Sequence, residues 1–292
     1  MSSLSVHGSS GLFLAAGSGE KKSTLLKQVA ASARLASVQP ASRLEVRPKP
    51  EMISTGIPAI DAISGGIPRG CLSEIYGPPS SGKTSLLLAT IAVAARSEET
   101  CALVDCSDSF DPASGWAAGL HFKRLLWVRC GIAPKTGIRH SRQSPIFPRP
   151  VSASDKKTDS EFRLEQVIKA TDLILQSGGF GLVALDLGGI GETFVRRIPM
   201  ASWFRFQRAV EHTKTALLVL SDTPCAQSCA TLILKLGARN QKSLPLVPWG
   251  APTHTLLFEG MRVEAEIVRT RLERKPAQSL RADFLTEGVR AA

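Results

Sequence analysis

The sequence has few aromatic residues. Phe, Trp and Tyr make up 5% of the 292 residues, and only one tyrosine is present. Proteins that bind single-stranded nucleic acid without sequence preference stack successive bases on aromatic side chains. The composition therefore argues against an extensive base-stacking platform.

Long apolar runs are also missing. No stretch approaches the ~18 apolar residues that a membrane-spanning helix needs. The run from Gly11 to Ala16 is too short for a convincing signal peptide and has no lysine or arginine before it. We therefore expect a cytoplasmic protein that does not enter a membrane.

The cysteines do not have the spacing of a zinc site. No C-x-x-C pair occurs, and Cys225 and Cys229, four residues apart, have no second pair at metal-binding spacing. We expect buried free thiols in a reducing compartment instead. The six are Cys71, Cys101, Cys106, Cys130, Cys225 and Cys229.

Acidic residues are outnumbered by basic ones. The chain has 36 Lys and Arg against 25 Asp and Glu, which gives a net charge of +11. Contact with a polyanion is plausible, although a basic surface can also simply keep a protein soluble. Hydrophobic residues reach 43%, enough for the core of one large α/β domain.

The most informative motif covers residues 77–85, GPPSSGKTS, which fits G-x-x-x-x-G-K-[ST] between an apolar strand (72–76) and a helix (83–96). In such a loop the glycines let backbone N–H groups point at phosphate oxygens, the lysine reaches the β- and γ-phosphates, and the hydroxyl binds Mg²⁺. The sequence therefore predicts ATP and Mg²⁺ as ligands. The predicted binding residues are Gly77, Pro78, Pro79, Ser80, Ser81, Gly82, Lys83, Thr84 and Ser85.

A carboxylate completes the predicted metal site. Residues 181–185 are an apolar strand that ends at Asp186. A buried strand after a phosphate loop delivers its last residue to the carboxyl edge of the sheet. We predict that Asp186 holds Mg²⁺ through water beside Thr84.

Apolar strands alternate with helical stretches, which predicts an α/β fold with a mostly parallel twisted sheet flanked by helices. Three parts are expected: a flexible N-terminus with one amphipathic helix (1–50), the nucleotide-binding core (51–238), and a C-terminal antiparallel β extension and tail (239–292). The predicted strands are 72–76, 101–105, 125–129, 181–186, 216–222, 229–236, and a pair, 254–259 and 261–271, joined at Gly260. The predicted helices are 21–38, 83–96, 161–176 and 199–212.

Residues 131–160 interrupt this pattern. The segment has four prolines, several serines and six basic residues, and is predicted to be a flexible basic insertion. Two interpretations remain open: a loop that binds nucleic acid or a partner, or a solvated insertion with little function.

The sequence resembles the RecA recombinase family, and the resemblance covers most of residues 53–290. ISTGIPAIDAISGGIPRGCLSEIYGPPSSGKTSLLLATIAVAA looks like the family's lead-in, phosphate loop and first helix. CALVDCSDSFDP resembles the next strand and its acidic turn, LEQVIKATDLILQSGGFGLVALD the helix and strand with the Mg²⁺ aspartate, and VEAEIVRTRLERKP a late strand. The resemblance implies a RecA-like P-loop NTPase core.

The departures from the family concern its chemistry. The family has a glutamate that activates the attacking water, and the matching residue here is Ser107, which cannot act as a base unaided. Asp105, Asp108 or Asp111 are the candidates to replace it. The family tyrosine that stacks on adenine matches Ser114, so this stacking is lost or passes to Trp116.

The regions linked to DNA also differ. The glutamine that senses the γ-phosphate is matched by Asp222 or Thr223, and the DNA-contacting loop after it is reduced to residues 223–228. The other DNA loop is represented by residues 191–199, where Arg196 and Arg197 are the candidate phosphate contacts.

Within the family, the chain most resembles ImuA-type proteins of bacterial SOS mutagenesis cassettes. That resemblance implies a DNA-repair accessory factor for translesion synthesis with weak or no ATP hydrolysis. The implied partners are a translesion polymerase, another RecA-like subunit (including a second copy) or single-stranded DNA. Two alternatives stay open: an active DNA-dependent ATPase recombinase, and an interaction scaffold that binds no nucleotide.

Overall fold

The computed structural model describes residues 49–130, 153–238, 260–272 and 280–287, and scattered positions between 21 and 31. Of residues 153–159, 238, 260–261 and 286–287 only the backbone is described. The chain divides into two compact units, residues 1–49 and 50–292. In the first unit, the described positions of the predicted 21–38 helix are helical. The predictions for residues 131–152 and 254–259 fall outside the described residues.

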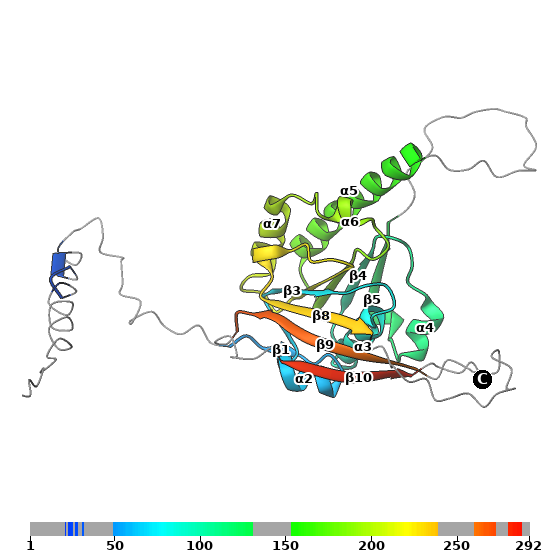
Figure 1. The fold of residues 1–292 in the computed structure, drawn as a ribbon, viewed down its shortest axis with the longest axis horizontal. Coiled ribbons are helices and arrows are strands. Elements are labelled where there is room, and N and C mark those ends of the chain that lie inside the picture. Colours follow the sequence, from blue (N-terminus) through cyan, green and yellow to red (C-terminus); the bar gives the residue numbers. More distant parts are fainter. Residues whose placement is uncertain are drawn as a thin grey trace, which may run out of the picture. The chain divides into compact units, whose positions relative to one another are not determined.

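The second unit is built on an eight-stranded, mostly parallel sheet (Figure 1). Strands β8, β3, β7, β6, β4 and β5 run parallel, and β9 and β10 continue the sheet antiparallel beyond β8. The order is β10-β9-β8-β3-β7-β6-β4-β5. The predicted fold class is therefore confirmed. The strands are β3 (Leu72–Tyr76), β4 (Cys101–Asp105), β5 (Leu125–Arg129), β6 (Leu182–Asp186), β7 (Ala216–Ser221), β8 (Leu232–Ala238), β9 (Gly260–Thr270) and β10 (Arg281–Glu287).

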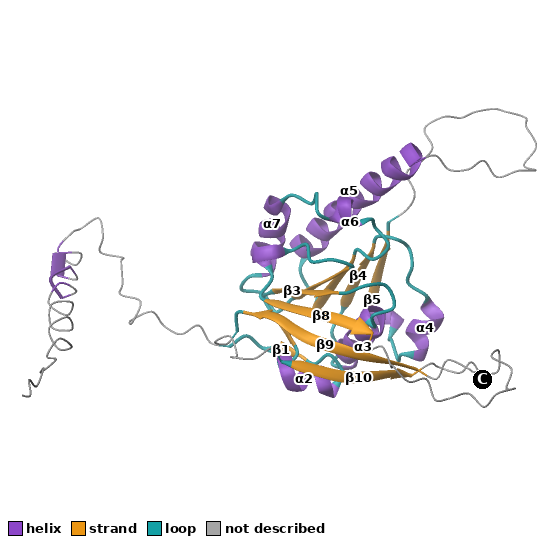
Figure 2. Cartoon of the chain, viewed as in Figure 1, coloured by secondary structure: helices purple, strands orange, loops and turns teal. Residues whose placement is uncertain are grey.

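Helices cover both faces of this sheet (Figure 2). A short antiparallel pair, β1 (Met52–Ile53) and β2 (Ile67–Pro68), flanks α2. No helix among the described residues is long and apolar enough to cross a membrane. The helices are α2 (Pro58–Ser64), α3 (Lys83–Arg96), α4 (Pro112–Ala117), α5 (Ala153–Ser177), α6 (Glu192–Val195) and α7 (Met200–Val210), with 3₁₀ turns at Phe122–Arg124 and Gln227–Cys229.

Two hydrophobic clusters fill the space between the sheet and the helices. In β4, Cys101 and Leu103 face the cluster that contains α3, whereas Ala102 and Val104 face the cluster that contains α5 and α7. Successive side chains of a strand point to opposite faces. Because both faces are covered, the central strands are continuous apolar runs, and this is why they were recognisable in the sequence.

The C-terminal β-pair differs from the prediction. Gly260 is not a turn between two strands but the first residue of β9, which pairs antiparallel with β8 and with β10. Strand β10 lies in the predicted C-terminal β extension and tail (239–292), beyond residue 271, where the last predicted strand ends. Among its described side chains, those of residues 281–285, Phe284 is buried and Ala282 is half-buried. The local pattern of the strand is therefore weak, and the pairing with β9 defines it.

Two elements start three or more residues away from their predicted positions. Helix α5 begins at Ala153, eight residues before the predicted start at Glu161. The basic insertion therefore ends earlier than predicted. No proline follows Pro150 in this segment, so the sequence allows a helix to begin there. Strand β8 begins at Leu232, because Gln227–Cys229 form a 3₁₀ turn.

All six cysteines lie in the described ranges as free thiols, and five of them are buried. Burial, as the main cause, raises the thiol pKa of Cys101 to about 12 and that of Cys130 to about 11, and raises the other four as well. The thiolate is the reactive form, and its fraction at pH 8 falls as the pKa rises. We expect a thiol reagent at pH 8 to modify the five buried cysteines of the native protein about a hundredfold more slowly than those of the guanidinium-unfolded chain. Equal rates in the two states would contradict the burial described here.

Candidate functional site

The predicted phosphate loop connects the end of β3 to the start of α3. Gly82, with φ 86°, is the N-cap of α3, and no side chain caps this helix end. The uncapped N–H groups of a first turn carry partial positive charge and suit an anion. Side chains are excluded where the loop is tight: a Cβ on Gly77 would lie 2.2 Å from the Leu236 carbonyl oxygen, and one on Gly82 would lie 2.7 Å from Val263. This backbone therefore fits a phosphate cradle.

Lys83 lies over this loop and contacts both its backbone and a distant carboxylate. Its Nζ donates to the carbonyl oxygens of Gly77 and Pro78 (3.2 Å to the latter) and lies 2.7 Å from Oδ1 of Asp222. The lysine side chain is 11% exposed and that of Asp222 is 31% exposed. The ammonium group is therefore held at the loop by oxygen atoms of the protein itself.

Three parallel strands, β7, β6 and β4, follow β3 across the sheet and end on the same side as the phosphate loop. Strand β7 lies between β3 and β6, with Tyr76 opposite Ser221 and Asp186 opposite Leu220. Asp186 in turn lies opposite Asp105 of β4. The carboxyl ends of parallel strands meet at one sheet edge. The structure thus brings Asp105, Asp186 and Asp222 to the edge that carries the phosphate loop.

Asp186 occupies the position predicted for the Mg²⁺ carboxylate. Burial raises its pKa, while the Gly188 N–H, which donates to Oδ1 at 2.8 Å, and the charge of Lys83 oppose this rise. Thr84 is exposed in the first turn of α3. A hydroxyl and a carboxylate are hard oxygen ligands of the kind that Mg²⁺ takes together with phosphate oxygens. These residues fit the ion, and their role as its ligands stays a prediction.

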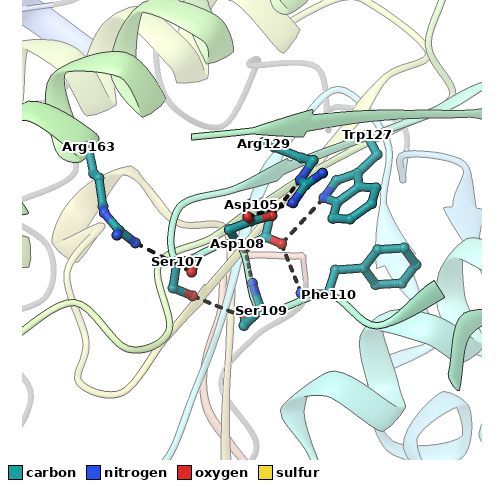
Figure 3. A network of polar contacts seen from close by, with 8 residues as sticks. All are labelled: Asp105, Ser107, Asp108, Ser109, Phe110, Trp127, Arg129 and Arg163. Atoms are coloured by element: carbon teal, nitrogen blue, oxygen red, sulfur yellow. Dashed lines mark hydrogen bonds and ion pairs between the residues drawn. The ribbon is translucent and has the colours of Figure 1, made fainter. Parts of the chain in front are cut away.

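The acidic turn after β4 holds the candidate bases, and Figure 3 shows its contacts. Asp105 is buried and accepts hydrogen bonds from the backbone N–H groups of Ser109 (3.1 Å) and Phe110 (2.9 Å) and from Nε1 of Trp127 (3.3 Å). These three donors fix the conformation of the turn. Its carboxylate therefore has a structural task already.

Asp108 and Asp111 are also engaged. Asp108, with φ 55°, forms a two-pronged ion pair with Arg129 at 2.6 and 2.7 Å, and this hydrogen bonding lowers its pKa. Asp111 caps α4 by accepting from Ala113 and Ser114, and the Ser114 contacts lower its pKa. A lowered pKa makes a carboxylate a weaker base.

Ser107 has no acidic partner in this turn. Its hydroxyl lies 3.0 Å from Oγ of Ser109, and its carbonyl oxygen accepts from Arg163 at 3.4 Å (Figure 3). A serine hydroxyl needs a neighbouring base to be deprotonated. The contacts in Figure 3 supply no such base to Ser107.

The residues predicted to contact DNA or adenine lie on the surface. Arg196 pairs with Glu192, and Arg197 lies 3.6 Å from Glu161. Trp116 on α4 is 74% exposed. Their roles in binding stay predictions, as do those of the described residues of the loop.

Comparison with known proteins gives a partial match. Residues 26–135 match the RecA N-terminal domain family. This segment is RecA-like. RecA of Ectopseudomonas oleovorans is 33% identical over 138 residues, which are 47% of this chain and 31% of that protein. RecA of Deinococcus radiodurans is 42% identical over 87 residues (29% and 23%), and RecA of Laribacter hongkongensis 29% over 166 residues (56% and 38%).

The match thus spans about a third of the RecA proteins, and a limited part of this chain. The RecA-like segment 26–135 contains the phosphate loop and Ser107, whereas Asp186, Arg196 and Asp222 lie beyond it. The similarity therefore bears on the loop and the acidic turn. Asp186 and Asp222 depend on the fold, whose strand order places the ends of β6 and β7 near the end of β3.

Two features of this site were not predicted from the sequence. Glu74 in β3 is fully buried, and its carboxylate accepts from the backbone N–H groups of Cys225 (2.5 Å) and Ala226 (3.3 Å). A charged residue inside the apolar strand LSEIY was the available sign, because a buried charge needs fixed partners. The contact between Lys83 and Asp222 joins residues 139 positions apart and had no local sign.

Within the described ranges, no cluster of three or more His, Cys, Asp or Glu side chains is arranged to hold a metal ion. Asp186 and Thr84 together supply one carboxylate and one hydroxyl, which are fewer ligands than such a cluster would have. An Mg²⁺ ion here would thus have to take its other ligands from phosphates and water.

Proposed function

We propose that this chain is a RecA-like ATP-binding factor in DNA repair that hydrolyses ATP weakly or not at all. ATP with Mg²⁺ would be held by residues 77–85, with Lys83 on the phosphates, Thr84 on the ion and Asp186 behind it. Bound nucleotide would act as a switch for assembly with a partner. No step of hydrolysis is assigned to a residue.

The observation that carries this proposal is the contrast between the two halves of the site. The phosphate loop keeps its glycines, its lysine and an uncapped helix end. The residue at the position of the family glutamate is Ser107. The nearby carboxylates already accept hydrogen bonds: Asp105 from amides of the turn, Asp108 from Arg129, and Asp111 from the first turn of α4. A general base typically raises the rate of a reaction by about 10²–10⁴-fold. A site without one can therefore bind ATP but hydrolyses it slowly.

The finer assignment is to an ImuA-type accessory factor of the SOS response, acting with a translesion polymerase or another RecA-like subunit. It is supported by the reduced loop at residues 223–228, which leaves little backbone for a DNA contact after β7. The positive net charge supports a role on nucleic acid. Arg196 and Arg197 are exposed and would have to exchange their carboxylate partners for phosphates.

Nucleotide binding and turnover by the purified protein, with and without single-stranded DNA, test this proposal. We expect ATP to bind in the presence of Mg²⁺ and turnover to stay slow in both conditions. Strong stimulation by DNA would instead favour the DNA-dependent recombinase. Absence of any nucleotide binding would favour the nucleotide-independent scaffold.

A gain of activity gives a sharper prediction. Replacing Ser107 with glutamate restores a carboxylate at the family position, and we expect ATP turnover to rise by about tenfold or more. Ser109→Glu, two residues along the same turn, is the matched control and is expected to change turnover little. An unchanged rate in Ser107→Glu, with ATP binding intact, would show that a missing base is not what limits hydrolysis.

A further inference from the structure

The ion pair between Lys83 and Asp222 is part of the candidate phosphate site rather than of its surroundings. Nζ of Lys83 is the group that a phosphate loop uses to reach the β- and γ-phosphates. Here Oδ1 of Asp222 lies 2.7 Å from it, and both side chains are less than a third exposed. A pair shielded in this way interacts more strongly than one at an open surface. A phosphate that binds Lys83 therefore has to compete with this carboxylate.

The position of Asp222 is fixed from both sides. Before it, the carbonyl oxygen of Ser221 accepts from the N–H of Gly77, the first residue of the phosphate loop, at 3.3 Å. After it, Glu74 accepts from the N–H groups of Cys225 and Ala226. Glu74 lies in β3, and Gly77 directly follows this strand. The carboxylate is thus presented to Lys83 by the backbone that also builds the phosphate cradle.

The charge of the sheet edge strengthens the competition. Asp105, Asp186 and Asp222 end or follow three adjacent strands. Lys83 pairs with Asp222, and its charge also acts on Asp186. A γ-phosphate adds negative charge to this edge, next to Asp222. ADP ends at the β-phosphate and brings less charge to the same place. Like charges at close range disfavour each other most where water is partly excluded.

We propose that Asp222 is a specificity-determining residue that makes this site discriminate against ATP in favour of ADP. The carboxylate competes with the terminal phosphate for Lys83 and repels it when it binds. This inference rests on the proposed function, since it requires that the loop binds adenine nucleotides. At a given mixture of ATP and ADP, a larger fraction of the protein would therefore hold ADP than if residue 222 were neutral.

An alternative role for Asp222 makes the opposite prediction. If Asp222 were a further ligand of Mg²⁺, it would stabilise ATP with the ion, and its removal would weaken ATP binding. Competition for Lys83 predicts that removal strengthens ATP binding. The two roles are thus separated by the sign of one measured change.

The test is calorimetric binding of ADP and of a non-hydrolysable ATP analogue, both with Mg²⁺, to the full chain and to Asp222→Asn and Asp222→Gln. We expect the dissociation constant of the ATP analogue to fall by about tenfold and that of ADP to change by about threefold or less. Asp172→Asn is the matched control, because Asp172 is also paired with a basic side chain, that of Arg205, but lies on α5. Circular dichroism checks that each variant is folded, and a result from either substitution suffices.

The outcomes separate this inference from the function on which it rests. An unchanged ratio of the two dissociation constants, or weaker binding of the ATP analogue, overturns the inference and leaves nucleotide binding in place. Absence of binding to wild type and to all variants overturns both. Binding of the ATP analogue by the Asp222 variants but not by wild type supports the inference in its strongest form.

Discussion

Replacing Lys83 with alanine is expected to weaken ATP binding by about tenfold to a hundredfold. A hydrogen bond to a charged group contributes about 1.5–3 kcal/mol, and every 1.4 kcal/mol is a factor of ten in affinity. Lys83 lies over the phosphate loop, with Nζ at the carbonyl oxygens of Gly77 and Pro78. Calorimetry with ATP and Mg²⁺ measures the change.

The matched control is Lys169→Ala. Lys169 is also paired with a carboxylate, Glu165 at 2.7 Å, but lies exposed on α5. Its removal should leave ATP affinity unchanged. If Lys83→Ala bound ATP as tightly as wild type does, the loop at residues 77–85 would not be the nucleotide site.

Lys83→Ala also removes the partner of Asp222, so its effect has two parts: the lost contact to phosphate and a carboxylate left without its cation. The double variant Lys83→Ala/Asp222→Asn separates them in a double-mutant cycle. We expect the double variant to bind ATP more tightly than Lys83→Ala alone. Such a difference would mean that Asp222 repels the nucleotide when no lysine screens it.

The sequence was sufficient to predict the elements that depend on local pattern. Strands β3, β4 and β5 and helix α3 have the predicted bounds. Their apolar runs are continuous because both sheet faces are covered, and the spacing of Gly77, Gly82 and Lys83 is set by the tight turn of the backbone. Patterns of this kind are determined within about ten residues of chain.

Contacts between distant residues could not be predicted in the same way. That Lys83 meets Asp222 follows from the placement of β7 next to β3, and the strand order is not encoded in either segment alone. Strand β10 illustrates the same limit, since residues 271–280 separate it from its partner β9 in the chain. Pairing of this type is defined by tertiary contacts that override weak local preference.

The acidic turn after β4 shows the limit at the level of side chains. From spacing alone, Asp105, Asp108 and Asp111 were equivalent candidates for a base. The structure gives each a different partner: the turn amides, Arg129 and the start of α4. Short polar side chains bond readily to nearby backbone and to any cation in reach, and the sequence does not tell which of these occurs.

The largest effect on stability is expected at Glu74. Replacing it with alanine leaves the N–H groups of Cys225 and Ala226 without their acceptor inside the protein, where each lost partner costs about 1–3 kcal/mol. We expect the free energy of unfolding to fall by about 3 kcal/mol, measured by urea denaturation followed by circular dichroism. Glu74→Gln keeps one acceptor oxygen and should lose about 1 kcal/mol.

The exposed Glu165 on α5 gives the control, since Glu165→Ala removes a surface carboxylate and should change stability by about 0.5 kcal/mol or less. A Glu74→Ala variant as stable as this control would mean that the two N–H groups find other acceptors. Because the same carboxylate fixes the backbone that follows Asp222, Glu74→Gln should also loosen the hold of Asp222 on Lys83. We therefore expect this folded variant to bind ATP more tightly relative to ADP than wild type does, in the same direction as Asp222→Asn.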